Sequence, residues 1–182
     1  MTRTPGRLVL ADGEVFEGEL VGHVPESGVA AGEVVFNTAL SGYQEIITDP
    51  SYAGQIITFT FPHVGNVGTN EEDIETVNMA AESGIRGVIV HANITEPANH
   101  RATRHFDQWL KARKIIGLCG IDTRALTALI RERGMMNAVI ATSTDGQFDR
   151  DALKKKAAQL PVVFHLLALS RNLASESTEI GF

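Results

Sequence analysis

The chain has 182 residues, enough for one domain with a sizeable hydrophobic core but too few for two full domains. Its 16 basic residues are outnumbered by 22 acidic ones, and the pI near 5.5 excludes the broad positive surface of a nucleic-acid-binding protein. The sequence has one cysteine and no apolar run long enough for a signal peptide or a membrane span, so we expect a cytoplasmic protein without a membrane partner.

The first half of the chain is predicted to form β-strands. Asp12-Gly13 lies between two extended segments within residues 7–22, which is a strong signal for a hairpin. Residues 63–70 contain two glycines and two asparagines, a composition that predicts a tight loop. Further short strands, rich in Val, Ile, Phe or Thr, are expected at 32–37, 55–61 and 87–91.

The hydrophobic spacing changes to that of helices at about residue 100. Phe106, Trp109 and Leu110 fall on one face of a helix within residues 101–113. A second helix is predicted within 120–134: Asp122 or Thr123 caps it, Gly134 ends it, and its buried stripe is Leu126, Leu129 and Ile130. Two more strands are expected at 115–119 and 137–141. This order predicts an α/β fold with sheets covered by helices.

The last part of the chain differs in character from the rest. Residues 148–160 predict an exposed helix, with Lys154–Lys156 on a solvated face. Residues 161–182 begin with a Pro-bounded apolar patch, which usually docks on another surface, and end in a polar segment. We therefore expect a domain over residues 1–145 and a helical linker over 146–182.

Several residues were weighed as catalytic or metal-binding groups. Cys119 ends an apolar run with no activating neighbour, so a core residue is the better interpretation. The spacing of the three histidines and the glutamate considered for a metal does not match a zinc site, and we expect none; these residues are His91, His100, His105 and Glu96. The glycines of 63–70 fit neither the Walker loop nor the dinucleotide-binding fingerprint, so a structural turn is the favoured interpretation.

The polar stretch FNTALSGYQEIITDPSY, residues 36–52, is the densest cluster of hydrogen-bonding groups. Glu33, Glu45 and Asp49 are acidic candidates there, although their separation cannot be read from the sequence. Pro50 restricts Asp49 to an extended conformation, so the Ser51 hydroxyl lies on a rigid turn, where it either closes the turn or binds a polar ligand. Tyr43 and Tyr52 are expected to be packing residues.

The same stretch is one of three segments that together resemble a known family. Residues 36–52, TFPHVGNVGTN (60–70) and GIDTRALTALIRERG (120–134) are similar to the N-terminal domain of the small subunit of glutamine-dependent carbamoyl-phosphate synthetase. With LVLADGEVFEGELVG (8–22) and GEVVFNT (32–38), the resemblance covers residues 7 to about 142. It implies a three-layer, swivelling β/β/α domain.

The resemblance also implies a role. In the family a glutaminase domain follows, and its Cys-His-Glu residues release ammonia from glutamine. A large subunit, which binds ATP and its metal ions, then makes carbamoyl phosphate from ammonia and bicarbonate for arginine and pyrimidine synthesis. Ser51 matches the serine of the family's DPSY turn, which helps to bind glutamine from across the domain boundary. No other residue is assigned, and no catalytic residue or cofactor is expected in this chain.

Three functions follow as hypotheses. The first is the N-terminal part of a ligase's small subunit, inactive alone because the sequence ends at Phe182 without the glutaminase residues. Its expected partners are the large subunit, the glutaminase domain and glutamine. The second is a stand-alone module that binds the large subunit without delivering ammonia. The third is a small hydrolase built on Ser51 and a histidine such as His63.

Overall fold

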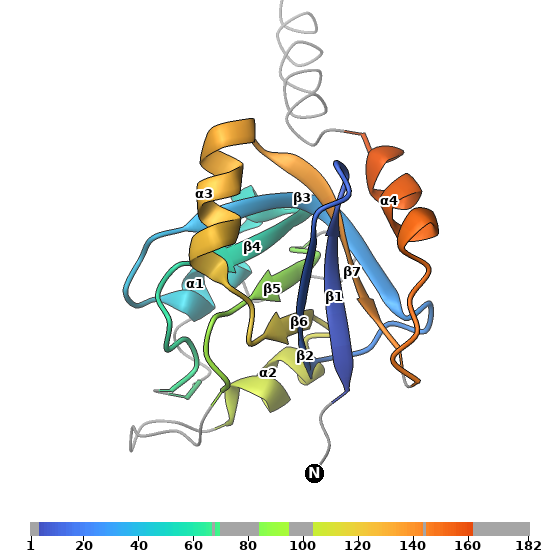
Figure 1. The fold of residues 1–182 in the computed structure, drawn as a ribbon. Coiled ribbons are helices and arrows are strands. Elements are labelled where there is room, and N and C mark those ends of the chain that lie inside the picture. The colour runs from blue at the N-terminus through green and yellow to red at the C-terminus, as the bar shows by residue number, and fades with distance from the viewer. Residues whose placement is uncertain (1–3, 67, 70–83, 95–103, 144, 162–182) are drawn as a thin grey trace, which may run out of the picture.

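The computed structural model describes residues 4–66, 68–69, 84–94, 104–143 and 145–161 (Figure 1). The strands are β1 (Pro5–Leu10), β2 (Val15–Gly22), β3 (Val29–Asn37), β4 (Gln55–Phe59), β5 (Gly87–Ile89), β6 (Ile116–Cys119) and β7 (Met136–Thr142). The helices are α1 (Tyr43–Thr48), a short 3-10 helix η1 (Pro50–Tyr52), α2 (Phe106–Ala112), α3 (Thr123–Arg133) and α4 (Arg150–Ala158).

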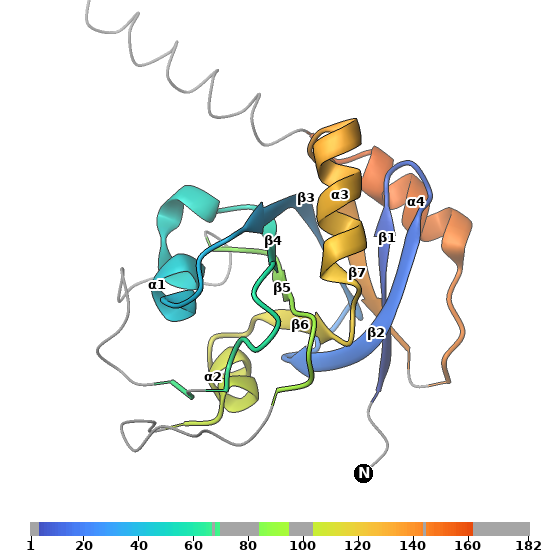
Figure 2. The same cartoon turned by 60° about the vertical axis from the view of Figure 1, so that its left-hand side comes forward.

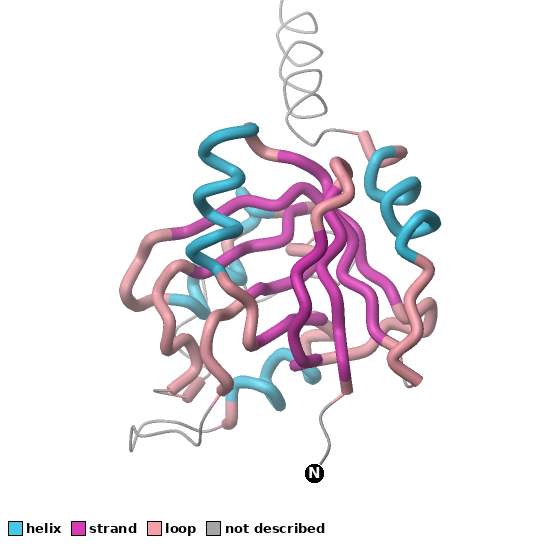
Figure 3. Tube along the Cα trace, in the orientation of Figure 1, coloured by secondary structure: helices cyan, strands magenta, loops and turns pink. Residues whose placement is uncertain are grey.

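The described strands form one closed barrel in the order β1-β2-β6-β5-β4-β3-β7 (Figure 3). Strands β3, β4, β5 and β6 run parallel to one another, whereas every pairing that involves β1, β2 or β7 is antiparallel. The predicted α/β class with mixed strands and helices is confirmed. The strand pairing itself shows a single closed sheet.

The interior of the barrel is filled by aliphatic side chains, and glycines make room for them. A Cβ added at Gly87 on β5 would lie 2.5 Å from Ile140 Cδ1 on β7, and one at Gly6 on β1 would lie 2.3 Å from Leu118 Cδ2 on β6. Neither pair of strands is adjacent in the barrel, so these side chains reach across its interior. Helix α3 adds Leu126 to the same buried cluster.

Helices cover the outer face of the barrel on different sides. Alternate residues of the parallel strands, such as Val35 and Ile57, point to the second buried cluster, where α1 contributes Ile47 and α2 contributes Phe106 and Trp109. Helix α4 packs its Ala157 against the outer residues of β7. Figures 1 and 2 place α1 and α4 on opposite sides of the barrel.

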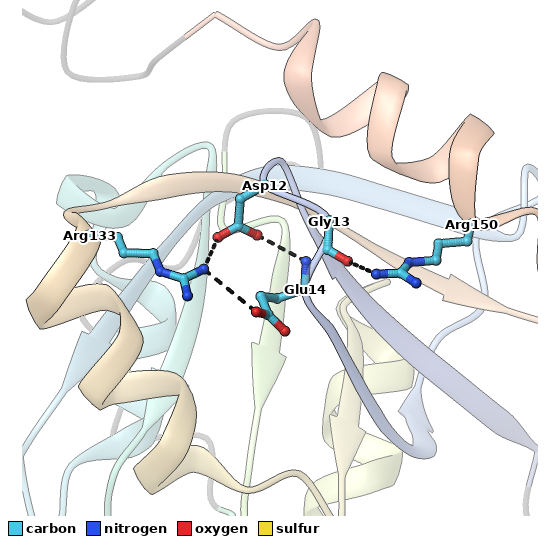
Figure 4. Close-up of polar contacts among 5 residues, drawn as sticks. All are labelled: Asp12, Gly13, Glu14, Arg133 and Arg150. Carbon is cyan, nitrogen blue, oxygen red and sulfur yellow. Dashed lines mark hydrogen bonds and ion pairs between the residues drawn. The ribbon is translucent and has the colours of Figure 1, made fainter.

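The β1–β2 turn holds α3 and α4 to the same end of the barrel (Figure 4). Arg133, in the last turn of α3, forms an ion pair of 2.6 Å with Asp12 and lies 3.7 Å from the Glu14 carboxylate. Arg150, the first residue of α4, donates a hydrogen bond of 2.6 Å to the Gly13 carbonyl. Residues 121 and 137 positions further along the chain, one on each helix, are therefore tied to one hairpin.

Most of the predicted elements are confirmed. The hairpin at Asp12-Gly13 and the strands expected at 32–37, 55–61, 87–91, 115–119 and 137–141 are present, with small shifts of their ends. Asp122 is the N-cap of α3, accepting a hydrogen bond of 2.9 Å from the Ala125 amide, and Gly134 is its C-cap. Leu129 is only partly buried, unlike Leu126 and Ile130.

Two helices, α4 and α1, differ from what the sequence predicted. Helix α4 has exposed lysines as predicted, but it is not solvated all round, because Ala157 is buried against the barrel. Helix α1 was not predicted at all. The expected apolar patch after Pro161 lies outside the described residues.

Candidate functional site

The candidate site is the connection between β3 and β4, residues 38–54. These neighbouring strands are parallel, so the chain must cross back between them and cannot use a tight hairpin. Helix α1 makes this crossing, and η1 follows it directly before β4. Within this segment, Tyr43 and Ile47 have the spacing of a helix, but one such pair is too little to predict a helix. Gly42, the N-cap, also supplies no capping side chain.

Tyr43 anchors α1 to the rest of the domain. Its side chain is buried, and its ring meets the Phe106 ring of α2 edge to face, with 5.1 Å between centroids. Its hydroxyl donates a hydrogen bond to the Gly68 carbonyl. The prediction that Tyr43 is a packing residue is confirmed, and the contact fixes α1 against both α2 and the loop at 63–69.

Asn37 ties the two ends of the connection together. Its side-chain amide donates to the Tyr52 hydroxyl at 3.0 Å, and its side-chain oxygen accepts from the Ala39 amide at 2.8 Å. Tyr52 also packs against the buried cluster beneath α1, as predicted for a packing residue. The last residue of β3 therefore holds η1 in place.

The turn that carries Ser51 is closed by Asp49. The Asp49 carboxylate accepts a hydrogen bond of 2.8 Å from the Ser51 backbone amide, and Pro50 occupies the first position of η1. The Ser51 side chain is exposed, and its hydroxyl makes no hydrogen bond to any residue that the structure describes. The sequence left open whether the Ser51 hydroxyl closes this turn. The Asp49 carboxylate closes it instead.

The three acidic candidates do not form a pair. Glu33 is buried at 1% exposure on β3, where its Oε2 accepts a hydrogen bond of 3.1 Å from the Gln55 side chain of β4. Its Oε1 has no partner among the described residues. Asp49 caps η1, and Glu45 lies in the first turn of α1. No hydrogen bond joins any two of these carboxylates in the described part of the chain.

The remaining candidates have structural roles. Cys119 is fully buried and its thiol donates to the Asn93 side chain at 3.2 Å, so the core assignment is confirmed. Nδ1 of His91 lies 2.9 Å from the Ile121 carbonyl oxygen, and Nδ1 of His105 accepts from the Asp107 amide as the N-cap of α2. His63 packs edge to face on Phe61, and no hydrogen bond joins it to Ser51 in the described part of the chain.

The absence of a metal site can be stated only for part of the chain. Within the described ranges no group of three or more His, Cys, Asp or Glu side chains is arranged to hold a metal ion. His100 and Glu96 lie outside those ranges. Among the helices that the structure describes, none has both the length and the apolar character needed to cross a membrane.

The loop at 63–69 is a structural turn where it is described. Gly65 has φ +89°, and a Cβ there would lie 2.8 Å from the Phe106 ring, so only glycine allows this close approach to α2. The Gly68 amide donates to the Gly65 carbonyl at 3.0 Å, which closes the turn. This arrangement supports α1 from below, through the Gly68 carbonyl that Tyr43 contacts.

Comparisons with known proteins show the family of this chain. Residues 8–140 match the family described as carbamoyl-phosphate synthase small chain, CPSase domain. The carbamoyl phosphate synthase small chain of Bradyrhizobium diazoefficiens is 68% identical over 154 residues, covering 85% of this chain and 38% of that protein. The small chain of Mesorhizobium japonicum is 64% identical, covering 83% of this chain and 37% of that protein. The small chain of Rhizobium meliloti is 65% identical, covering 82% of this chain and 37% of that protein.

This chain thus spans less than two fifths of the length of these curated relatives. The match nevertheless runs from the second half of β1 through most of β7, and it includes the whole β3–β4 connection with its Ser51 turn. On that match, the chain belongs to the carbamoyl-phosphate synthase small chain family, through its CPSase domain.

Proposed function

We propose that this domain is the N-terminal part of the small chain of a glutamine-hydrolysing carbamoyl-phosphate synthase, a cytoplasmic ligase. Its family membership supports this role, as do relatives named as small chains at 63–68% identity. In this role the domain provides no catalytic residue. It binds the large chain, where ATP and its metal ions are used, and it borders a glutamine site on a following glutaminase domain. The swivelling β/β/α description belongs to this proposal.

One observation carries the assignment of Ser51 to glutamine binding. Its hydroxyl is exposed and makes no hydrogen bond within the described residues, although the turn around it is fully hydrogen-bonded. Such a group can donate to a carboxylate or accept from an ammonium, and glutamine carries both at its α-carbon. Ser51 is thus a substrate-binding residue in this proposal, with Asp49 positioning it.

The rigidity of the turn strengthens the proposal. Pro50 fixes one backbone dihedral, Asp49 fixes the Ser51 amide, and the Tyr52 hydroxyl is held by Asn37. A preorganised hydroxyl loses little conformational entropy on binding. A hydrogen bond to a charged ligand group then contributes about 1.5–3 kcal/mol, which corresponds to roughly tenfold or more in affinity.

The same connection provides a contact surface for a partner chain. Leu40 is 75% exposed, the highest value among the exposed large hydrophobic residues of the described part. It borders a small hollow with Ser41, Tyr43 and Phe61. Aromatic side chains are enriched at protein interfaces, and an exposed leucine beside them adds apolar area that a partner can bury. We therefore assign residues 38–52 to contacts with the large chain or the glutaminase domain.

The Ser51 assignment can be tested in a joined protein. The chain is fused to the part of the Bradyrhizobium diazoefficiens small chain that lies beyond the matched region, and glutamine hydrolysis is measured with the large chain present. We expect Ser51→Ala to raise the KM for glutamine about tenfold with a smaller change in kcat. Ser51→Thr, which keeps the hydroxyl, should restore most of the affinity.

The matched control is Ser41→Ala, which removes another exposed hydroxyl of the same connection. An unchanged KM in Ser51→Ala, or equal effects of Ser41→Ala and Ser51→Ala, would contradict the role of Ser51. The family assignment would stand in either case.

The partner assignment is tested by titrating the isolated chain against a carbamoyl-phosphate synthase large chain. Binding is expected, and Leu40→Asp should weaken it at least tenfold because a charge would enter an apolar contact. Met135→Asp, at an exposed residue between α3 and β7, is the control and should not weaken it. If Leu40→Asp binds as tightly as the unmodified chain, residues 38–52 are not the contact surface.

Glutaminase activity is expected to be absent from the isolated chain. Ammonia release from glutamine, measured with a coupled assay, should remain at background, and Cys119→Ala should not change it. Turnover that Cys119→Ala abolishes would show that the buried thiol is a nucleophile and would overturn the non-catalytic assignment.

A further inference from the structure

A pocket of ≈ 340 Å³ opens at the end of the barrel where parallel strands begin. Val29 and Ile116 are the first residues of β3 and β6, and Arg86 directly precedes β5. Val29, Ala30 and Ile116 provide an apolar wall, while Arg86 and Lys114 provide positive charge. No residue of the Ser51 turn (49–52) lines it. A pocket of this size is at the lower end of those that bind small molecules.

Neither cation of the pocket is neutralised by the described residues. Arg86 and Lys114 are both exposed, and neither has an ion pair or a side-chain hydrogen bond within the described part of the chain. The chain has a formal net charge of −6, so acidic partners are not scarce in its composition. Two like charges at one pocket repel each other, and a bound anion would remove that repulsion.

The backbone around both cations is well fixed. The Arg86 amide donates to the Gln55 carbonyl at 2.7 Å, and the stem of Arg86 lies over Gly32, where an added Cβ would be 3.0 Å from Arg86 Cγ. On the other side, the His23 amide donates to the Ile115 carbonyl at 2.8 Å. The bases of the two charged side chains are therefore held in place before any ligand arrives.

Lys114 has an unusual backbone conformation. Its φ is +56°, the only positive value of a non-glycine residue in the described ranges. It follows the C-cap of α2, where the Lys114 amide donates to the Lys111 carbonyl and the Ile115 amide to the Leu110 carbonyl. Glycine suits this position best because a Cβ is strained in the left-handed region. A lysine there gives up stability and places a cation at the pocket, which is a pattern typical of functional positions.

We propose that this pocket binds a small organic anion. Its carboxylate or phosphate lies between the Arg86 and Lys114 side chains, and its apolar part rests on Val29, Ala30 and Ile116. Arg86 provides planar paired donors for either group, and Lys114 provides a mobile point charge.

The proposal is tested by NMR titration of the 182-residue chain with butyrate and with butyl phosphate, using butanol as the neutral analogue. We expect both anions to shift the amide signals of residues 30, 86 and 114–116 in a saturable manner. Butanol should shift them weakly, because it lacks the charge. Inorganic phosphate, which lacks the apolar part, should bind more weakly than butyl phosphate.

Two substitutions distinguish this site from general attraction of anions. Lys114→Gly and Arg86→Gln should each weaken butyrate binding about tenfold or more, since each removes one charge-assisted contact. Lys114→Gly relieves the backbone strain, so a loss of binding in this variant cannot be due to unfolding. Lys155→Gln, at an exposed lysine of α4, is the matched control and should leave binding unchanged.

Three results would overturn the proposal. One is the absence of saturable shifts with either organic anion. Another is equal binding of butyrate by Lys114→Gly and by the unmodified chain. The third is equal weakening by Lys155→Gln and Arg86→Gln, which would indicate nonspecific attraction to positive side chains. A preference for butyl phosphate over butyrate, or the reverse, would identify the anionic group of the ligand.

Discussion

The β1–β2 turn and the β3–β4 connection contain the same hydrogen-bonded aspartate turn, but the polar groups around it differ in their partners. In both, an aspartate accepts a hydrogen bond from the amide two residues later: Asp12 from Glu14 at 3.0 Å, and Asp49 from Ser51 at 2.8 Å. Around Asp12 the other polar groups are taken up by Arg133 and Arg150. Around Asp49 the Ser51 hydroxyl has no partner among the described residues. Polar density alone therefore does not separate a turn whose polar groups are all used within the fold from one that leaves a hydroxyl available.

The largest effect is expected from the support beneath the β3–β4 connection. Phe106 is fully buried and contacts the rings of Tyr43 and Trp109. Phe106→Ala should lower the free energy of unfolding by about 3–5 kcal/mol, because it leaves a cavity under α1. Urea denaturation measures this, with Phe148→Ala as the milder control, because the Phe148 ring precedes α4, is only partly buried and lies beneath the Arg7 side chain of β1. Equal effects of the two would show that α1 does not depend on α2.

The losses of stability on substituting Asp49 and Ser51 should be smaller and should differ from each other. Asp49→Ala removes the cap of η1 and should cost about 1 kcal/mol of stability. Ser51→Ala should change stability by less than about 0.5 kcal/mol, because the hydroxyl makes no hydrogen bond that the structure describes. Thermal and urea unfolding of both variants check this. A large loss in Ser51→Ala would mean that the hydroxyl is structural after all.

At the β1–β2 turn, breaking the ion pair of Arg133 should cost still less stability. Arg133 is an exposed side chain, and the carboxylates of Asp12 and Glu14 raise its pKa above its ordinary value, chiefly through the hydrogen bond to Asp12. Arg133→Gln should lower stability slightly, and the difference should shrink as salt is added, since exposed ion pairs are screened. Arg124→Gln, at an exposed arginine of the same helix, is the control. A difference that grows with salt would contradict an ion-pair origin.

The smallest effect concerns a third turn of the same type. The hydroxyl of Ser143 and the amide of Gln147 donate to the Asp145 carboxylate and hold its pKa below the ordinary 3.8, with the Ser143 contact the larger cause. A lowered pKa stabilises the fold above pH 3.8, and this contribution is lost as the pH falls through the folded pKa. Ser143→Ala should move the Asp145 pKa up towards 3.8 in an NMR titration. An unchanged pKa would assign the shift to the Gln147 amide.

The sequence predicted the elements whose signals are local. The Asp12-Gly13 hairpin, the cap at Asp122 and the stripe of Leu126 and Ile130 depend on neighbours a few residues away, and all are present. Helix α1 was missed because its stability comes from Tyr43 meeting Phe106, a residue 63 positions later in the chain. Barrel closure was missed for the same reason, since the pairing of β3 with β7 joins segments about 100 residues apart.

The candidate site was predictable in its identity but not in its chemistry. The DPSY segment identified Ser51 through a resemblance, yet nothing in the sequence showed that Asp49 would close the turn and leave the hydroxyl unused. The pocket with Arg86 and Lys114 was not predictable at all. Its walls come from β3, from β6 and from the residues just before β5, and Lys114 takes its left-handed conformation between the end of α2 and the start of β6.

Closure of the barrel restricts how this domain can be recognised. Every described strand is hydrogen-bonded on both sides, so the described sheet has no free edge on which a partner could add a strand. Recognition by β-augmentation, in which backbone groups supply most of the affinity, is therefore closed to this domain through these strands. Within the described part, the side chains on the helices and connections are the surface left for recognition, where single substitutions can change specificity without altering the sheet.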